Sequence, residues 1–253
     1  MRKLLCAVLA LCLAASMAAC AGDNSSSASS EAESVEVMSY DEYMAAAVDD
    51  AVTIQAYVQA KQSYYAEQGT ATVYLQDQDG AYFAYDMACT QEEYDAMTEG
   101  TCIQVTGFKS EWSGEIEIMD GQLDQIVEGD TFVAEPLDAT ELLGTDELEQ
   151  HQNEKVSFTG LTVAPSTIEG DTTEYAFLYN YDGSGTQGDD VYFNVEYNGE
   201  TYQFLVESYL CDSSTDVYKA VEALEIGQTI DCEGFLYWYE GVNPHITSVT
   251  VAG

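Results

Sequence analysis

The chain has 253 residues, a length that allows two small domains, and 46% of them are apolar, enough for each domain to bury a core. It carries 46 acidic residues against 6 basic ones, a formal net charge of −40, and its one arginine is Arg2. Nucleic acids and anionic lipid surfaces are bound mainly through lysine and arginine. The charge therefore predicts that the folded part binds neither, and it favours solubility in an exposed setting.

The N-terminus has the features of an export signal. A basic start precedes the apolar run 4–19, which is too short to span a bilayer comfortably. The run ends in Ser16-Met17-Ala18-Ala19-Cys20, which resembles the lipobox of bacterial lipoproteins. This resemblance implies that 1–19 is a signal peptide, that Cys20 becomes the lipid-bearing N-terminus (palmitate included), and that the protein is anchored to the outer side of a bacterial cell membrane. An ordinary secretory signal is the alternative.

The segment 20–38 is rich in serine, alanine and glutamate and is predicted to be a flexible tether. The first folded unit follows, with apolar and polar residues alternating in its predicted strands. Capping boxes at Ser39 and Thr90 predict two short helices, and Asp79-Gly80 predicts a hairpin turn. The expected helices are 40–48 and 91–98, and the expected strands are 52–58, 72–76, 82–86, 102–109 and 115–119.

The second half repeats this plan. Glycines occur at intervals of seven in both halves, at Gly100, Gly107 and Gly114 and again at Gly227, Gly234 and Gly241. The strand 156–162, the turn at Asn198-Gly199 and the helix 217–224 take the places of their counterparts in the first half. Short helical pieces near 138–143 and 145–151 are expected in the connection, and an insertion near 174–190 in the second copy.

Each copy runs strand, strand, strand, helix, strand, strand. This order resembles the OB fold, a five-stranded Greek-key barrel with a helix between its third and fourth strands. The resemblance implies a mainly β protein of two tandem barrels, in domains 39–130 and 131–253. A two-sheet sandwich is the alternative architecture.

Aromatic residues give the main indication of function, since the chain has 19 tyrosines and 2 tryptophans. In OB folds the loops after the first and fourth strands flank the face that binds oligonucleotides or oligosaccharides. The aromatic residues expected in those loops are Tyr64, Tyr65, Trp112, Tyr179, Tyr181, Tyr237, Trp238 and Tyr239. Flat rings beside carboxylate acceptors suit sugar rings, although the tyrosines could simply cover barrel strands.

Metal and catalytic sites receive little support from the sequence. Asp182, Asp189 and Asp190 lie in the insertion in an arrangement that faintly resembles a calcium loop, without its full spacing or closing glutamate. The two histidines, His151 and His245, fall in different units and suggest no catalytic triad.

The cysteines allow disulfides in an exported protein. Cys89, Cys102, Cys211 and Cys232 are divided two per unit. Cys102 lies two residues after Gly100, whereas Cys232 lies five residues after Gly227, so the two cysteines do not occupy equivalent positions. This argues against equivalent disulfides in the two units, and Cys232 is predicted to be a buried residue that packs like a small apolar one.

These observations predict a lipid-anchored, non-catalytic binding protein of the bacterial cell envelope, without a cofactor, whose ligand is a glycan or a peptide. Its partners would be the membrane, through the lipid, and a glycan or surface protein. One alternative is a carboxylate-based hydrolase of surface polysaccharide, and another is a calcium-dependent adhesion module. Nucleic-acid binding is suggested only by analogy with other OB folds, and the charge disfavours it.

Overall fold

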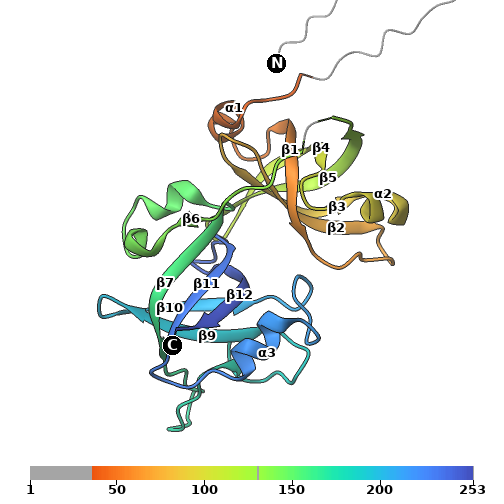
Figure 1. The fold of residues 1–253 in the computed structure, drawn as a ribbon. Helices are drawn as coiled ribbons and strands as arrows, with labels where there is room; N and C mark the ends of the chain where they lie inside the picture. The colour runs from red at the N-terminus through yellow and green to blue at the C-terminus, as the bar shows by residue number, and fades with distance from the viewer. Residues whose placement is uncertain (1–35, 130, 253) are drawn as a thin grey trace, which may run out of the picture. The chain divides into compact units, whose positions relative to one another are not determined.

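Two OB-like barrels follow one another along the chain (Figure 1). The computed structural model describes residues 36–129 and 131–252. The predicted signal peptide, Cys20 and most of the tether lie outside the described residues. In the described part of the chain, no helix has the length and the apolar character that crossing a membrane requires.

The first barrel closes in the strand order β1-β2-β3-β5-β4. Its neighbouring strands are antiparallel except for β3 and β5, which are parallel. Its elements are α1 Tyr40–Ala45, β1 Ala51–Lys61, β2 Thr70–Gln76, β3 Ala81–Ala88, α2 Gln91–Ala96, β4 Cys102–Trp112 and β5 Glu115–Val127. Both predicted capping boxes are present, at Ser39 with Glu42 and at Thr90 with Glu93, and they fix where α1 and α2 begin.

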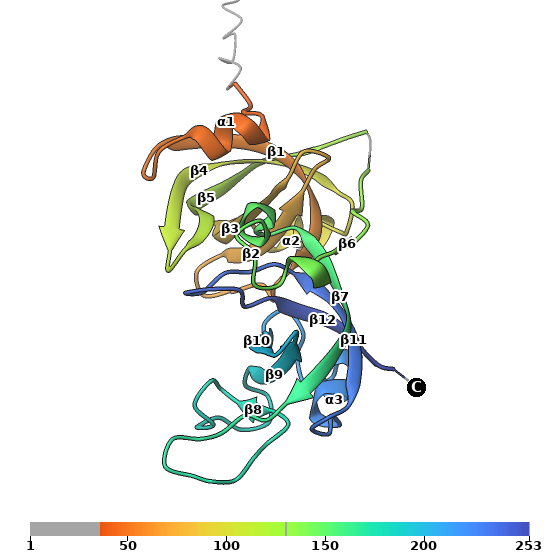
Figure 2. The same cartoon turned by 90° about the vertical axis from the view of Figure 1, so that its left-hand side faces the viewer.

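The second barrel has the same connectivity. β7 pairs with β9 and β11, β10 pairs with β9, and β12 pairs with β11 and, in parallel, with β10. Figure 2 shows β7, β11 and β12, which are neighbours in the sheet in that order. Its elements are β6 Leu137–Asp138, η1 Thr140–Leu142, η2 Leu148–His151, β7 Lys155–Ala164, β8 Leu178–Tyr179, β9 Val191–Tyr197, β10 Glu200–Val206, α3 Asp216–Glu222, β11 Thr229–Phe235 and β12 His245–Val251. The predicted duplication of an OB-like barrel is therefore confirmed.

The repeated glycines have matched structural roles. Gly100 and Gly227 follow the helices with φ of +84° and +88°, a conformation that glycine adopts without strain. The middle glycines lie against the strand that follows. A Cβ at Gly107 would be 2.6 Å from Ile118 Cγ2, and one at Gly234 would be 2.2 Å from the His245 carbonyl oxygen. The close approach of two strands therefore requires glycine at these positions.

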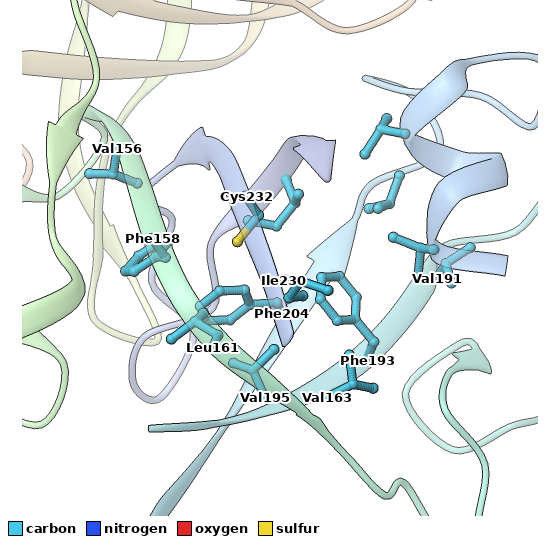
Figure 3. Close-up of a cluster of buried hydrophobic side chains, with 14 of the residues drawn as sticks. Val156, Phe158, Leu161, Val163, Val191, Phe193, Val195, Phe204, Ile230 and Cys232 are labelled. Atoms are coloured by element: carbon cyan, nitrogen blue, oxygen red, sulfur yellow. The ribbon is translucent and has the colours of Figure 1, made fainter. Parts of the chain in front are cut away.

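Each barrel buries its own apolar core, and the core of the second is shown in Figure 3. The two cores match in register, since Ile54 lies opposite Val105 in the first and Phe158 opposite Cys232 in the second. Cys232 is 3% exposed and takes the place of a small apolar residue, as predicted. All four cysteines in the described part of the chain are free.

Two elements differ from the sequence-based expectation. β5 continues to Val127 rather than ending near 119, and it pairs with β4 over its whole length. The polar stretch around Asp120, where φ is positive, hides this continuation in the sequence. In the connection between the barrels, the predicted short helical pieces are the 3-10 helices η1 and η2, and the two-residue strand β6 before them was not predicted.

The two barrels contact each other, and their described residues belong to one compact unit. We call the contact region the inter-barrel joint. At its centre the rings of Tyr74, Phe83 and Phe235 pack together, with Tyr74 and Phe235 stacked at 4.6 Å. Hydrogen bonds surround these rings, namely Ser63 N–Tyr209 O, Gln152 Nε2–Gly114 O, Trp238 N–Glu115 Oε2, Lys155 N–Gln76 Oε1 and Tyr74 Oη–His245 Nδ1.

Candidate functional site

Exposed aromatic side chains gather at one place in the described part of the chain. Seven such side chains are at least 43% exposed, namely Tyr65, Tyr85, Phe108, Trp112, Tyr181, Tyr209 and Tyr239. All of them except Phe108 line one or the other of two cavities beside the inter-barrel joint. Exposed aromatic rings that gather in concave places are typical of ligand-binding sites.

The first of these, the tryptophan cavity, has a volume of about 550 Å³. Its aromatic lining is Trp112, Tyr181, Tyr192, Tyr237 and Tyr239, and its polar lining includes Gln203, Glu240 and Asn243. Trp112 comes from the first barrel and the other lining residues come from the second. The tryptophan cavity therefore forms only when both barrels are folded and in contact.

The tight turn between β4 and β5 positions Trp112. Ser113 and Gly114 both have positive φ there. The turn lies against the second barrel, because the Trp238 indole would be 2.9 Å from a Cβ at Gly114 and Glu240 N donates to Ser113 O at 2.8 Å. Trp112 lines the cavity and remains 59% exposed, whereas Trp238 packs against the turn at Gly114.

The second, the tyrosine cavity, has a volume of about 600 Å³. Tyr64, Tyr65, Phe83 and Tyr85 line it from the first barrel, and Tyr209 and Tyr237 from the second. Its polar lining includes Gln62, Asp86, Glu207 and His245. Tyr237 and His245 also line the tryptophan cavity, and their rings are stacked at 4.2 Å.

Buried titratable groups surround this shared wall. Burial lowers the pKa of His245 to about 3, so its ring is neutral, and Nδ1 shares a hydrogen bond with the Tyr74 hydroxyl. Burial also raises the pKa of Glu207 to about 7, of Glu117 to about 7 and of Glu115 to about 8. The joint therefore contains carboxyl groups that change charge near neutral pH.

Neither cavity is lined by a lysine. Lys61 donates to the Tyr94 carbonyl, and Lys109 to the carbonyls that end α1. Lys155 pairs with Glu99 at 3.6 Å, and Lys219 donates to the Ser214 carbonyl. Since His245 is neutral, the lining of the two cavities has no compensating positive charge.

The structure brings together most of the predicted binding residues. Trp112, Tyr181, Tyr237 and Tyr239 meet in the tryptophan cavity, and Tyr64 and Tyr65 meet Tyr237 in the tyrosine cavity. Two predicted residues have other roles. Trp238 packs in the joint, and the Tyr179 hydroxyl donates to Glu222 Oε1 at 2.5 Å beside α3.

Several lining residues were missed by the sequence analysis, including Phe83, Tyr85, Tyr192 and Tyr209. Phe83 and Tyr85 alternate along β3, so period-two spacing could have placed them on one face. Tyr209 lies between β10 and α3, and it reaches the cavity because Ser63 N donates to its carbonyl across the joint. The sequence holds no signal for that contact.

The three aspartates proposed for calcium are engaged in local hydrogen bonds. Asp182 accepts from Ser184 N, Asp189 from Thr186 N, and Asp190 from the backbone and hydroxyl of Ser208. Within 36–129 and 131–252 no three histidine, cysteine or acidic side chains are placed to hold a metal ion. The structure therefore does not join these aspartates into a calcium site.

Comparison with known proteins adds information on the fold. No protein family matches the chain, and neither does any curated protein sequence. Among solved structures, a murine DNA-binding protein bound to double-stranded DNA is 11% identical, with 79% of this chain and 96% of that chain covered and a TM-score of 0.36. The Ifi202 HINa domain in complex with double-stranded DNA is 12% identical, with 80% and 98% covered and a TM-score of 0.33.

The single-stranded DNA-binding protein from Thermus aquaticus is 14% identical, with 82% and 95% covered and a TM-score of 0.26. These matches correct one prediction, namely that nucleic acid is not a partner, because DNA-binding proteins are among the structures that the chain resembles. At identities of 11% to 14% and TM-scores of 0.26 to 0.36, these matches concern the fold alone.

Proposed function

We propose that this protein is a non-catalytic binding protein of the bacterial cell envelope that holds a glycan in the tryptophan cavity. The gathering of exposed rings there carries the proposal. Trp112, Tyr181 and Tyr239 are 59%, 70% and 50% exposed. Rings left this exposed beside a cavity retain apolar area for a ligand to cover, and sugar rings present flat C–H faces to them.

The polar lining supports the same ligand class. Gln203, Glu240 and Asn243 supply amide and carboxylate groups near the rings. Sugar hydroxyls both donate and accept hydrogen bonds, so a lining of amides with one carboxylate matches them. Small-molecule sites are usually lined by many apolar and aromatic side chains and a few polar groups, and the tryptophan cavity has this composition.

The binding test uses the chain without its leader on an array of bacterial surface oligosaccharides, followed by titration of any glycan that binds. Trp112→Ala and Tyr239→Ala should each weaken binding at least about tenfold, as expected for a ring at the centre of a binding site. Phe108→Ala is the matched control, because Phe108 is 46% exposed but lies outside both cavities.

A single-stranded oligonucleotide is titrated in parallel, because bases also stack on aromatic rings. Binding of the oligonucleotide without any glycan, lost in the Trp112→Ala variant, would replace the glycan with nucleic acid as the ligand. Glycan binding that survives both ring substitutions would remove the tryptophan cavity from the proposal.

The location in the cell envelope is proposed from the N-terminal leader, because the residues Ser16 to Cys20 resemble a lipobox. In a bacterial host fed an alkyne-tagged palmitate, the wild-type chain should become labelled and remain with the membrane fraction. Cys20→Ala should abolish the label and release the chain from the membrane, because no lipid can then be attached. Equal labelling of both chains would contradict the anchor.

A further inference from the structure

The tyrosine cavity combines aromatic walls with carboxylates. Six rings line it, three of them at least 43% exposed, and they come from both barrels. The rings are not coplanar, since Phe83 and Tyr237 meet at 65° with centroids 5.4 Å apart. Its volume of about 600 Å³ is within the range of small-ligand sites.

A carboxylate is built into the cavity wall. Glu207 is 8% exposed, and its oxygens accept from the backbone N–H groups of Tyr209 at 3.2 Å and Leu210 at 2.7 Å. These bonds hold the side chain in place while it lines the cavity. Asp86 lines the same cavity from β3.

The negative charge of this wall is not balanced by the protein. No lysine lines the cavity, and the one basic ring in it, His245, is kept neutral by burial, which lowers its pKa to about 3. A buried carboxylate without a cation is unfavourable, and burial accordingly raises the pKa of Glu207 to about 7. A ligand that carries a positive charge would stabilise the ionised form.

We propose that the tyrosine cavity binds a small quaternary ammonium group, of the kind found in choline. Such a cation is attracted to the faces of tyrosine rings, and an aromatic cage is the usual protein site for it. It needs no set of coordinating oxygens, in contrast to calcium, which takes six to eight. The strongly acidic chain would also raise the local concentration of any cation.

The first test titrates the chain without its leader, by calorimetry at pH 8, with choline and with 3,3-dimethyl-1-butanol, the neutral isostere. Choline should bind at least about tenfold more tightly, because only the charge differs. Phosphocholine is titrated in the same way, because tighter binding of phosphocholine than of choline would indicate a lipid headgroup rather than the free cation as the ligand. Binding of either ligand that contains a quaternary ammonium group supports the site, and equal binding of the neutral alcohol would overturn it.

Variants locate the site. Tyr85→Ala and Tyr209→Ala should each weaken choline binding at least about tenfold, and both side chains are exposed enough that folding should be retained. Phe108→Ala is the control, since Phe108 is 46% exposed and lines neither cavity. Unchanged choline affinity in both Tyr85→Ala and Tyr209→Ala would contradict the assignment without affecting the glycan proposal.

The pH profile tests the carboxylate. Wild-type affinity for choline should fall as the pH is lowered through about 7, where Glu207 takes up a proton. Glu207→Gln should bind weakly and lose this dependence, while its amide oxygen can still accept from Leu210 N. The titratable groups that face Glu207 are Asp190, Tyr74, Tyr192 and Cys211. A profile that is the same in Glu207→Gln would exclude Glu207 from the site.

Discussion

The free energy of unfolding is expected to fall by a few kcal/mol as the pH rises from 5 to 8.5. Glu115 is fully buried, and burial raises its pKa from 4.5 to about 8. Below pH 4.5 the carboxyl is protonated in both folded and unfolded chains. Above that value the unfolded chain ionises first, so stability is lost until the folded pKa is passed. Each unit of difference is worth about 1.4 kcal/mol.

Burial favours the neutral form of Glu115, whereas the hydrogen bonds from Asn153 and Trp238 lower its pKa. Glu115 Oε2 accepts from Trp238 N at 2.8 Å, but Oε1 is buried and has no partner among the described residues. Asn153 Oδ1 is likewise buried without a partner among the described residues. A proton on Glu115 removes the buried charge, and burial is the main cause of the raised pKa. The other titratable groups that face Glu115 are Glu117, Tyr43, Tyr74 and Tyr237.

Glu115→Gln separates this effect from the general acidity of the chain. Glutamine keeps an oxygen to accept from Trp238 N, and it carries no charge at any pH. Urea unfolding at pH 5 and pH 8.5 should therefore show a variant that is more stable than wild type at the higher pH and similar to it at the lower. Equal slopes of stability against pH in the two chains would show that Glu115 is not the responsible group.

Truncation of Phe235 to alanine should lower the free energy of unfolding by about 3–5 kcal/mol. Phe235 is 3% exposed, and its ring stacks on Tyr74 of the other barrel at 4.6 Å. Its loss leaves a cavity between the barrels that the fixed strands around it cannot fill. Tryptophan fluorescence during urea unfolding is a suitable measurement, because Trp112 and Trp238 both lie where the barrels meet.

Phe108→Ala provides the comparison for this experiment. Phe108 is also on a strand but is 46% exposed, so its truncation should change stability by less than about 0.5 kcal/mol. A loss below about 1 kcal/mol for Phe235→Ala would mean that the barrels do not pack through this ring in solution.

The sequence was sufficient to predict each barrel separately. Spaced glycines, capping boxes and hairpin turns are local signals, and the structure contains the elements that they specify, including Ser39 with Glu42 and the turn at Asn198-Gly199. The strand Glu115–Val127 was predicted too short, because tertiary pairing with β4 overrides the polar residues within it.

The site was predictable only in part, because it depends on how two barrels meet. Loop aromatics such as Trp112 and Tyr181 could be chosen from their positions in an OB-like order. Nothing in the sequence indicates that Tyr209 would meet Ser63, or that Trp238 would be covered by the turn at Gly114. Contacts between barrels join residues far apart in the chain, and periodicity carries no information about them.

Tyr237 belongs to the walls of both cavities, which has a thermodynamic consequence. A ligand that shifts this ring on one side alters the surface offered on the other. Two ligands bound to one folded molecule would then be linked, each changing the affinity of the other by the same factor. A choline titration repeated at saturating glycan would measure that factor directly.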